Sequence, residues 1–232
     1  MLQLNSVVHL FNHHKLKKMK KILLILLFSV SINSVFADSP LTNSDFYKAY
    51  LGVPLVDKTS KSNGILTDEI FCYLNSKANS IDKKIALINS LKWNINGKNN
   101  AVLYFKKLVL IHKKYTPNNF YNKGTSEELI CYAYLKAMDN YFDVKIASLF
   151  SVRANELNPN SYTISIVNQL IKVQMIVSPN DWCEVYSGMD KIRENKDLVV
   201  DFRKEASDII FNYTDGYKEY CTFWYSIRKF FQ

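Results

Sequence analysis

The sequence has few of the residues that make tight turns. Only six glycines and five prolines occur among its 232 residues. A β-sandwich or β-barrel needs turn residues at intervals of roughly 8 to 12 positions, so this scarcity argues against both architectures. The prolines stand where the apolar pattern breaks, at positions 40, 54, 117, 159 and 179. We therefore expect the chain between them to be helical.

Histidine is also scarce, which argues against most metal chemistry. Three of the four histidines lie at positions 9, 13 and 14, and His112 is the remaining one. A structural zinc site needs four cysteine or histidine ligands, usually in close pairs. The chain beyond position 14 has no such pair, and it has no nucleophile elbow, phosphate-binding glycine loop or dinucleotide-binding fingerprint. We therefore predict no metal ligands, no cofactor-binding residues and no catalytic residues.

The N-terminal part contains an apolar run that is too short to cross a membrane. Two lysines follow Met19, an apolar run extends from residue 22 to residue 30, and small side chains stand at Val35 and Ala37. This order is typical of a secretory signal peptide, whereas a membrane span needs about 20 apolar residues. We predict a signal peptide over residues 19–37 that is cleaved near Ala37. Residues 1–18 fit no signal-peptide design and are interpreted as a mis-annotated upstream extension.

A cleaved signal peptide would place residues 38–232 in the periplasm or outside the cell. Five of the 30 lysines and arginines lie before residue 38, together with none of the 21 acidic residues. The exported part therefore carries 25 basic and 21 acidic residues, an ordinary balance for a protein surface. A nucleic-acid-binding protein would need a denser basic face. We predict no nucleic-acid partner and no stable transmembrane anchor, and the oligomeric state stays open.

All four cysteines belong to the exported part. An even number in an oxidising compartment favours two disulfides. The candidates are Cys72, Cys131, Cys183 and Cys221. We favour the pairs Cys183–Cys221 and Cys72–Cys131, because each would join neighbouring helices. Two other pairings are open, and so is the alternative of free buried thiols.

Apolar residues recur at intervals of three and four through most of the chain, which is the period of an α-helix. The clearest pattern is in residues 126–142, where every fourth residue from Leu129 to Tyr141 is apolar. Thr125 and Glu128 have the spacing of a capping box at its start. Similar patterns predict helices near residues 44–51, 67–79, 81–93, 98–114, 143–157, 161–177, 180–194, 197–213 and 217–231.

The connections between these helices are short, which favours antiparallel neighbours. We predict one all-α domain over residues 38–232, with about eight to ten helices stacked as antiparallel hairpins in a short solenoid or an irregular bundle. One segment resembles the second helix of a tetratricopeptide repeat, because Ala147, Ala154 and Pro159 have the spacing of its small residues and terminal proline. The resemblance covers a single copy, and Ser151 replaces an aromatic residue. It supports helical hairpins without assigning the family.

The C-terminal segment is rich in aromatic residues. A stripe at positions 217, 220, 221, 224, 227 and 231 has helical spacing and is expected to dock onto the preceding helices. Phe223, Tyr225 and Phe230 lie off this stripe, and we interpret them as candidates for a partner surface, where aromatic residues are enriched. A helix lying on a membrane surface is an alternative.

Two lysine pairs form a second candidate surface. Lys106 and Lys107 precede Lys113 and Lys114 by seven positions, which is helical spacing. The pairs predict a positive strip on one helix. Such a strip is either a solvated face or a site for an acidic partner or an anionic envelope polymer.

The sequence favours a soluble, non-enzymatic protein that binds another envelope or secreted protein, such as an envelope immunity protein or an adaptor. This interpretation rests on the missing catalytic motifs. The alternative is a small helical cell-wall hydrolase, since glycoside cleavage can use two carboxylates without a cofactor. Its acid would be one of the available glutamates, such as Glu69, Glu127, Glu128 and Glu156.

Overall fold

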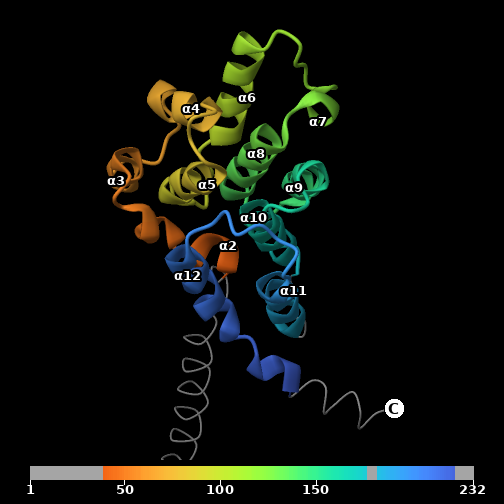
Figure 1. The fold of residues 1–232 in the computed structure, drawn as a ribbon. Helices are drawn as coiled ribbons and strands as arrows, with labels where there is room; N and C mark the ends of the chain where they lie inside the picture. The colour runs from red at the N-terminus through yellow and green to blue at the C-terminus, as the bar shows by residue number, and fades with distance from the viewer. Residues whose placement is uncertain (1–38, 177–181, 223–232) are drawn as a thin grey trace, which may run out of the picture. The chain divides into compact units, whose positions relative to one another are not determined.

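The computed structural model describes residues 39–176 and 182–222, and these residues are predominantly helical (Figure 1). They contain no strand, only an isolated β-bridge between Ser161 and Val199. The all-α class is thereby confirmed. The helices are α2 (Pro40–Asn43), η1 (Phe46–Tyr50), α3 (Pro54–Ser60), α4 (Asp68–Asn75), α5 (Ile81–Ser90), α6 (Asn100–Ile111), α7 (Phe120–Lys123), α8 (Ser126–Asp139), α9 (Lys145–Leu157), α10 (Tyr162–Val173), α11 (Trp182–Glu194) and α12 (Lys204–Asp215).

Most predicted helices are present, and the differences have local causes. The short helices α2, α3 and α7 were not predicted. In the case of α2 and α3, the prolines were interpreted as breaks. Pro40 and Pro54 instead occupy the first position of each helix. There the missing N–H costs nothing and the fixed φ suits the helix. The predicted start of α12 at residue 197 was wrong, since the helix begins at Lys204.

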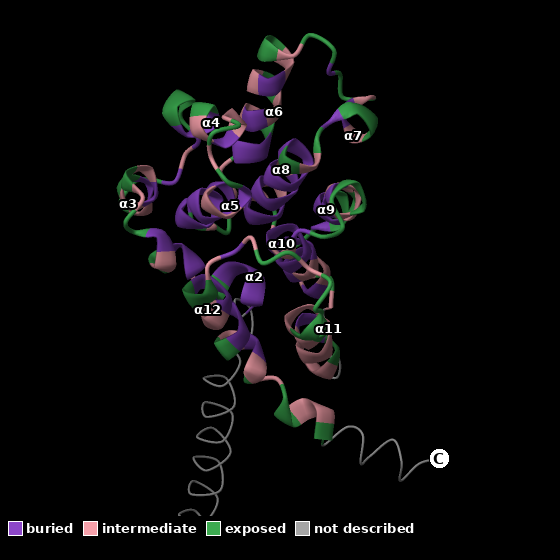
Figure 2. Ribbon diagram, in the orientation of Figure 1, coloured by how far each residue is buried: buried purple, intermediate pink, exposed green. Residues whose placement is uncertain are grey.

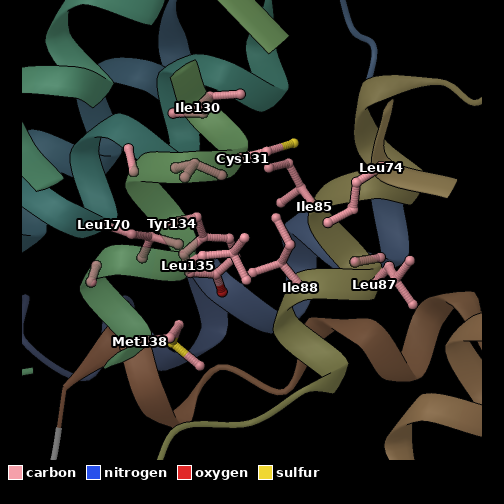
Figure 3. Packing of buried hydrophobic residues seen from close by; sticks show 14 of the residues in the cluster. Leu74, Ile85, Leu87, Ile88, Ile130, Cys131, Tyr134, Leu135, Met138 and Leu170 are labelled. Carbon is pink, nitrogen blue, oxygen red and sulfur yellow. The ribbon is translucent and has the colours of Figure 1, made fainter. Parts of the chain in front are cut away.

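Helices α5, α8 and α10 supply most of the core. Each is buried on most of its circumference, as the predominantly purple ribbons in Figure 2 show. Figure 3 shows Ile85 and Ile88 of α5 directed toward α8, Ile85 beside Cys131 and Ile88 beside Leu135. Full burial of a large apolar side chain stabilises a fold by about 1.5–3 kcal/mol. This packing gives the surrounding helices a rigid support.

A buried amide joins the N-terminal segment to this core. The Asn89 Oδ1 atom accepts a hydrogen bond from the Tyr47 N–H at 2.9 Å. Its Nδ2 atom donates to the Tyr134 hydroxyl at 2.9 Å and to the Ser44 carbonyl at 3.2 Å. A buried amide without partners would be costly, and here every polar atom of the side chain is bonded.

The start of α6 is held by the end of α8. The Asp139 carboxylate accepts hydrogen bonds from the backbone N–H groups of Ala101, at 2.8 Å, and Lys98, at 3.3 Å. Gly97 has a φ of +69°, and a Cβ atom at this position would collide with the Asp139 carbonyl oxygen. The turn before α6 therefore approaches α8 more closely than a larger residue would allow.

Arginine side chains join the last described helices to the preceding ones and to each other. Arg203 donates to the Ala49 carbonyl at 2.8 Å and lies over the Tyr50 ring. Arg193 of α11 binds both carboxylate oxygens of Asp215 in α12, at 2.8 and 3.0 Å.

Within the described residues, no helix is long and apolar enough to cross a membrane.

One predicted disulfide is present and the other is not. Cys183 and Cys221 form a disulfide with a Cα–Cα distance of 4.6 Å, as the favoured pairing predicted. Cys72 is exposed on α4 and Cys131 is buried in α8, and both are free thiols. The predicted pair Cys72–Cys131 was therefore wrong. Cys72 faces solvent, whereas Cys131 faces the core.

Candidate functional site

Helix α9 turns its small residues toward the core and its large apolar residues toward solvent. The buried side consists of Ala147, Ser148, Ser151 and Ala154. On its exposed side lie Ile146, Leu149 and Leu157, and Phe142 is exposed just before the helix; we call these four residues the outer face of α9. Leu149 is 57% exposed and Phe142, just before the helix, is 62% exposed. A surface helix normally has the opposite arrangement.

The inner side of α9 is held in place by short polar contacts. The Ser126 hydroxyl of α8 donates to the Ala154 carbonyl at 2.6 Å. The Ser151 hydroxyl donates to Asn168 Oδ1 of α10 at 2.9 Å. Small side chains permit this close approach, and a rotation of α9 would break both bonds. The outer face is thus held in its outward orientation.

A cluster of aromatic rings adjoins α9. Phe120 of α7 is buried at its centre, with its ring centroid 5.1 Å from Phe105 of α6, 5.6 Å from Tyr132 of α8 and 5.7 Å from Phe150 of α9. Tyr121 meets Phe150 at 5.6 Å. We call the four half-buried rings of Phe105, Tyr121, Tyr132 and Phe150 the aromatic patch.

The aromatic patch and the outer face of α9 are continuous. Phe150 follows Leu149 directly and lies one helical turn after Ile146. Its ring also contacts Tyr132 at 4.8 Å. Figure 2 shows that α9 has one buried and one exposed edge. The two features together make one apolar surface that extends from α6 across α8 to α9.

A buried carboxylate marks one border of the aromatic patch. Glu128 accepts hydrogen bonds from the Tyr115 hydroxyl, at 2.6 Å, and from the Thr125 N–H, at 2.8 Å. Thr125 and Glu128 form the predicted capping box. Burial raises the pKa of Tyr115 above its usual value, and the hydrogen bond to Glu128 raises it further. The Nε2 atom of His112 lies 3.4 Å from the same carboxylate.

The lysine pairs do not lie on one helix, so that prediction needs correction. Helix α6 ends at Ile111, and Lys113 and Lys114 lie in the following turn. Lys107 is half-buried and forms an ion pair with Asp68 of α4. Lys106 is exposed on α6, and Lys114 lies 4.9 Å from the centre of the Tyr115 ring. Lys106, Lys113 and Lys114 therefore remain exposed.

The C-terminal candidates are only partly described. Phe223, Tyr225 and Phe230 lie outside the described residues. The beginning of the predicted stripe packs as expected, because Tyr217 and Tyr220 contact the Trp182 ring at 5.7 and 4.5 Å. This contact lies beside the disulfide.

Each of the four glutamates considered as catalytic acids has a partner within the fold. Glu69 pairs with Lys58 at 2.5 Å, and Glu156 pairs with Arg153 at 3.0 Å. Glu127 pairs at 2.5 Å with Lys84, a lysine that is almost fully buried. Glu128 completes the capping box. Within the described part of the chain, no group of three or more histidine, cysteine, aspartate or glutamate residues could hold a metal ion.

Comparison with protein-family models, curated proteins and solved structures finds no match for this chain. The surface is therefore interpreted from its own chemistry. Sequence analysis did not identify the outer face of α9, although residues 142, 146, 149 and 157 have helical spacing. The sequence feature that could have revealed this face is the row of small residues on the opposite side of the helix. Small residues fill little core volume, but they allow two helices to pack closely.

Proposed function

We propose that the protein is exported and acts without catalysis, by binding another envelope or secreted protein through the aromatic patch and the outer face of α9. The main support for the proposal is that α9 buries its small side chains and exposes large apolar ones, an arrangement that we call its inverted orientation. A helix that exposes Leu149 and Ile146 while burying alanines leaves apolar area in water, where a partner could cover it.

The chemistry of the surface suits recognition of a protein. Covering a large apolar side chain completely is worth about 1.5–3 kcal/mol. The aromatic rings are already held against Phe120, so binding would cost little side-chain entropy. Stacking of successive helices as antiparallel hairpins would make the supporting surface rigid.

The proposed compartment is the periplasm or the exterior. It rests on the predicted signal peptide over residues 19–37, and the Cys183–Cys221 disulfide is compatible with an oxidising environment. Blocking a toxin in the envelope, as an immunity protein does, or joining two envelope proteins would both use such a surface.

The proposal can be tested by purifying the tagged full-length protein from the envelope of the source cells. We expect a stoichiometric partner with the unaltered protein and its loss with Leu149→Glu, because a buried charge opposes apolar contact. Leu51→Glu is the matched control. Leu51 is also an exposed leucine, but it follows η1, which packs against α3, α5 and α12.

Two results would contradict the proposal. The first is a partner that remains equally bound to the Leu149→Glu and unaltered proteins. The second is clearing of purified cell wall by the protein that disappears with Glu127→Gln or Glu128→Gln, which would favour the hydrolase alternative. Circular dichroism of each variant confirms that the helical content is preserved.

A further inference from the structure

We infer that the partner of this surface is an acidic protein segment that presents a helix with apolar side chains at intervals of three and four. The inference rests on the proposed function and deepens it. It is carried by the charges that surround the aromatic patch and the outer face of α9, together with the shape of the apolar surface.

Most of the net positive charge of the exported chain lies in the stretch of residues that contains this surface. Residues 100–157 contain eight basic and five acidic residues. The rest of the exported part contains seventeen basic and sixteen acidic residues, and is therefore nearly neutral. Residues 100–157, which include the helices of the apolar surface and their connections, thus carry most of the net charge. This charge attracts an acidic partner over distances of about one Debye length, roughly 10 Å.

The acidic side chains of this region are already engaged within the fold. Glu127 pairs with Lys84, and Glu156 pairs with Arg153. Glu128 accepts a hydrogen bond from the Tyr115 hydroxyl, and Asp139 accepts hydrogen bonds from two backbone N–H groups at the start of α6. Asp143 accepts a hydrogen bond from the backbone N–H of Lys145. None of these five acids forms a salt bridge with a lysine of residues 100–157 in the described part of the chain.

Several lysines, in contrast, have no ion-pair partner among the described residues. They are Lys106, Lys113, Lys123, Lys136 and Lys145. Lys136 lies one turn after Tyr132 on α8, and Lys145 lies one turn before Leu149 on α9. Lys123 follows Tyr121 by two residues on α7. Each of the four helices that build the apolar surface therefore carries one of these unpaired lysines.

The shape favours a helix as the ligand. Helix α9 has 13 residues and is about 20 Å long, so its outer face could contact three to four turns of a facing helix. Such recognition uses apolar anchors at positions i, i+3, i+4 and i+7. A second copy of this chain would bring the same positive border, and the two borders would repel each other. Charge complementarity therefore selects an acidic partner over self-association.

The experiment is a display selection on the immobilised, fully processed protein. The probe is a library of helical peptides of about 18 residues, with leucine, phenylalanine or alanine at anchor positions and glutamate or lysine in equal amounts elsewhere. We expect peptides with large apolar anchors to be enriched, and the glutamate-to-lysine ratio to rise about tenfold. An unchanged ratio, or a preference for lysine, overturns the inference.

Variants locate the binding on this surface. With one selected peptide, the double variant Lys136→Glu, Lys145→Glu should weaken binding about tenfold, and so should Leu149→Glu. The control Lys191→Glu, Lys196→Glu reverses two exposed lysines at α11 and just after it and should change affinity less than about twofold. Equal weakening by both double variants overturns the inference, because the effect would then be one of net charge.

Two rival occupants give distinct results. Tight binding to vesicles of anionic lipid that is lost with Leu149→Glu would replace the acidic helix with a membrane surface. A dimer in sedimentation that Leu149→Glu dissociates would replace it with a second copy. If a stoichiometric partner is captured but no acidic preference appears, the inference fails and the proposed function stands. If neither appears, both fail.

Discussion

Individual side chains of the same type have very different surroundings in this protein. Cys131 is fully buried in α8, and burial raises the pKa of its thiol to about 12, although the nearby Lys84 lowers it. Cys72 is exposed on α4. Since the thiolate is the reactive form, burial protects Cys131 both from deprotonation and from contact with reagents.

We therefore expect one thiol of the native protein to react with a charged disulfide reagent at pH 8. Cys72→Ala should abolish this reaction, whereas Cys131→Ala should leave it unchanged. Unfolding in denaturant should release the second thiol. Absence of any reactive thiol in the native protein would contradict the structure and support the Cys72–Cys131 disulfide that the sequence suggested.

The ion pair between Arg193 and Asp215 predicts a pH dependence of stability. The two hydrogen bonds from Arg193 hold the pKa of Asp215 below its usual value of 3.8. A carboxylate with a depressed pKa stabilises the fold at pH values above the unfolded value, and this contribution is lost as the pH falls through the folded value. The loss should therefore occur below about pH 4.

Asp215→Asn should lower the free energy of unfolding by about 1 kcal/mol at pH 7, as expected for a partly exposed ion pair. At pH 2 the difference from the unaltered protein should disappear. Urea denaturation at both pH values measures this. Asp208→Asn removes the exposed pair with Lys204 and should have a smaller effect. A pH-independent loss with Asp215→Asn would contradict the assignment.

Single elements show why the fold was easier to predict than the site. The period of apolar residues indicated most helices, including α8 with its capping box, because these signals are local in sequence. The bonds that place the helices are not local: Asn89 joins η1 to α8, and Asp139 caps α6 from another helix. No pattern within one segment reveals such a partner.

Helix α9 shows the limit of pattern analysis most clearly. Residues 143–157 were predicted to be helical and largely are, but an apolar pattern does not say which side faces the core. Close packing against α8 and α10 selected the small residues for the interior. The outer face was therefore visible only in three dimensions, as was the separation of Lys113 and Lys114 from α6.

The inverted orientation predicts opposite responses to substitution on the two sides of α9. Ala154→Leu adds volume at a fully buried position and should destabilise the protein by about 1–3 kcal/mol. Leu149→Ala on the outer face should change stability by less than about 0.5 kcal/mol. Thermal and urea denaturation measure both. A large loss with Leu149→Ala would show that this face packs against the protein itself.

At the scale of the whole molecule, the apolar surface and the disulfide belong to different parts of the described helices. Helices α6 to α9 carry the apolar surface and its lysines. The disulfide joins the start of α11 to residues 217–222, where Trp182 packs on Tyr220. The covalent link and the candidate binding surface thus involve separate sets of helices.

This separation predicts that stability and binding can be altered independently. Replacing both Cys183 and Cys221 by serine should lower the free energy of unfolding by about 2–4 kcal/mol, because the closed loop is long. Partner capture at a temperature where the variant remains folded should be unaffected. If capture is lost while circular dichroism shows intact helices, the binding surface includes the disulfide-linked segment.

The central claim is that the outer face of α9 contacts a protein in the envelope. The most direct test replaces Leu149 with a photo-crosslinking amino acid in the source cells and examines the adducts after illumination, with the same replacement at Leu51 for comparison. The account predicts one discrete protein adduct from position 149 and none from position 51. Illumination that yields no adduct from position 149, or the same adducts from both positions, would contradict it.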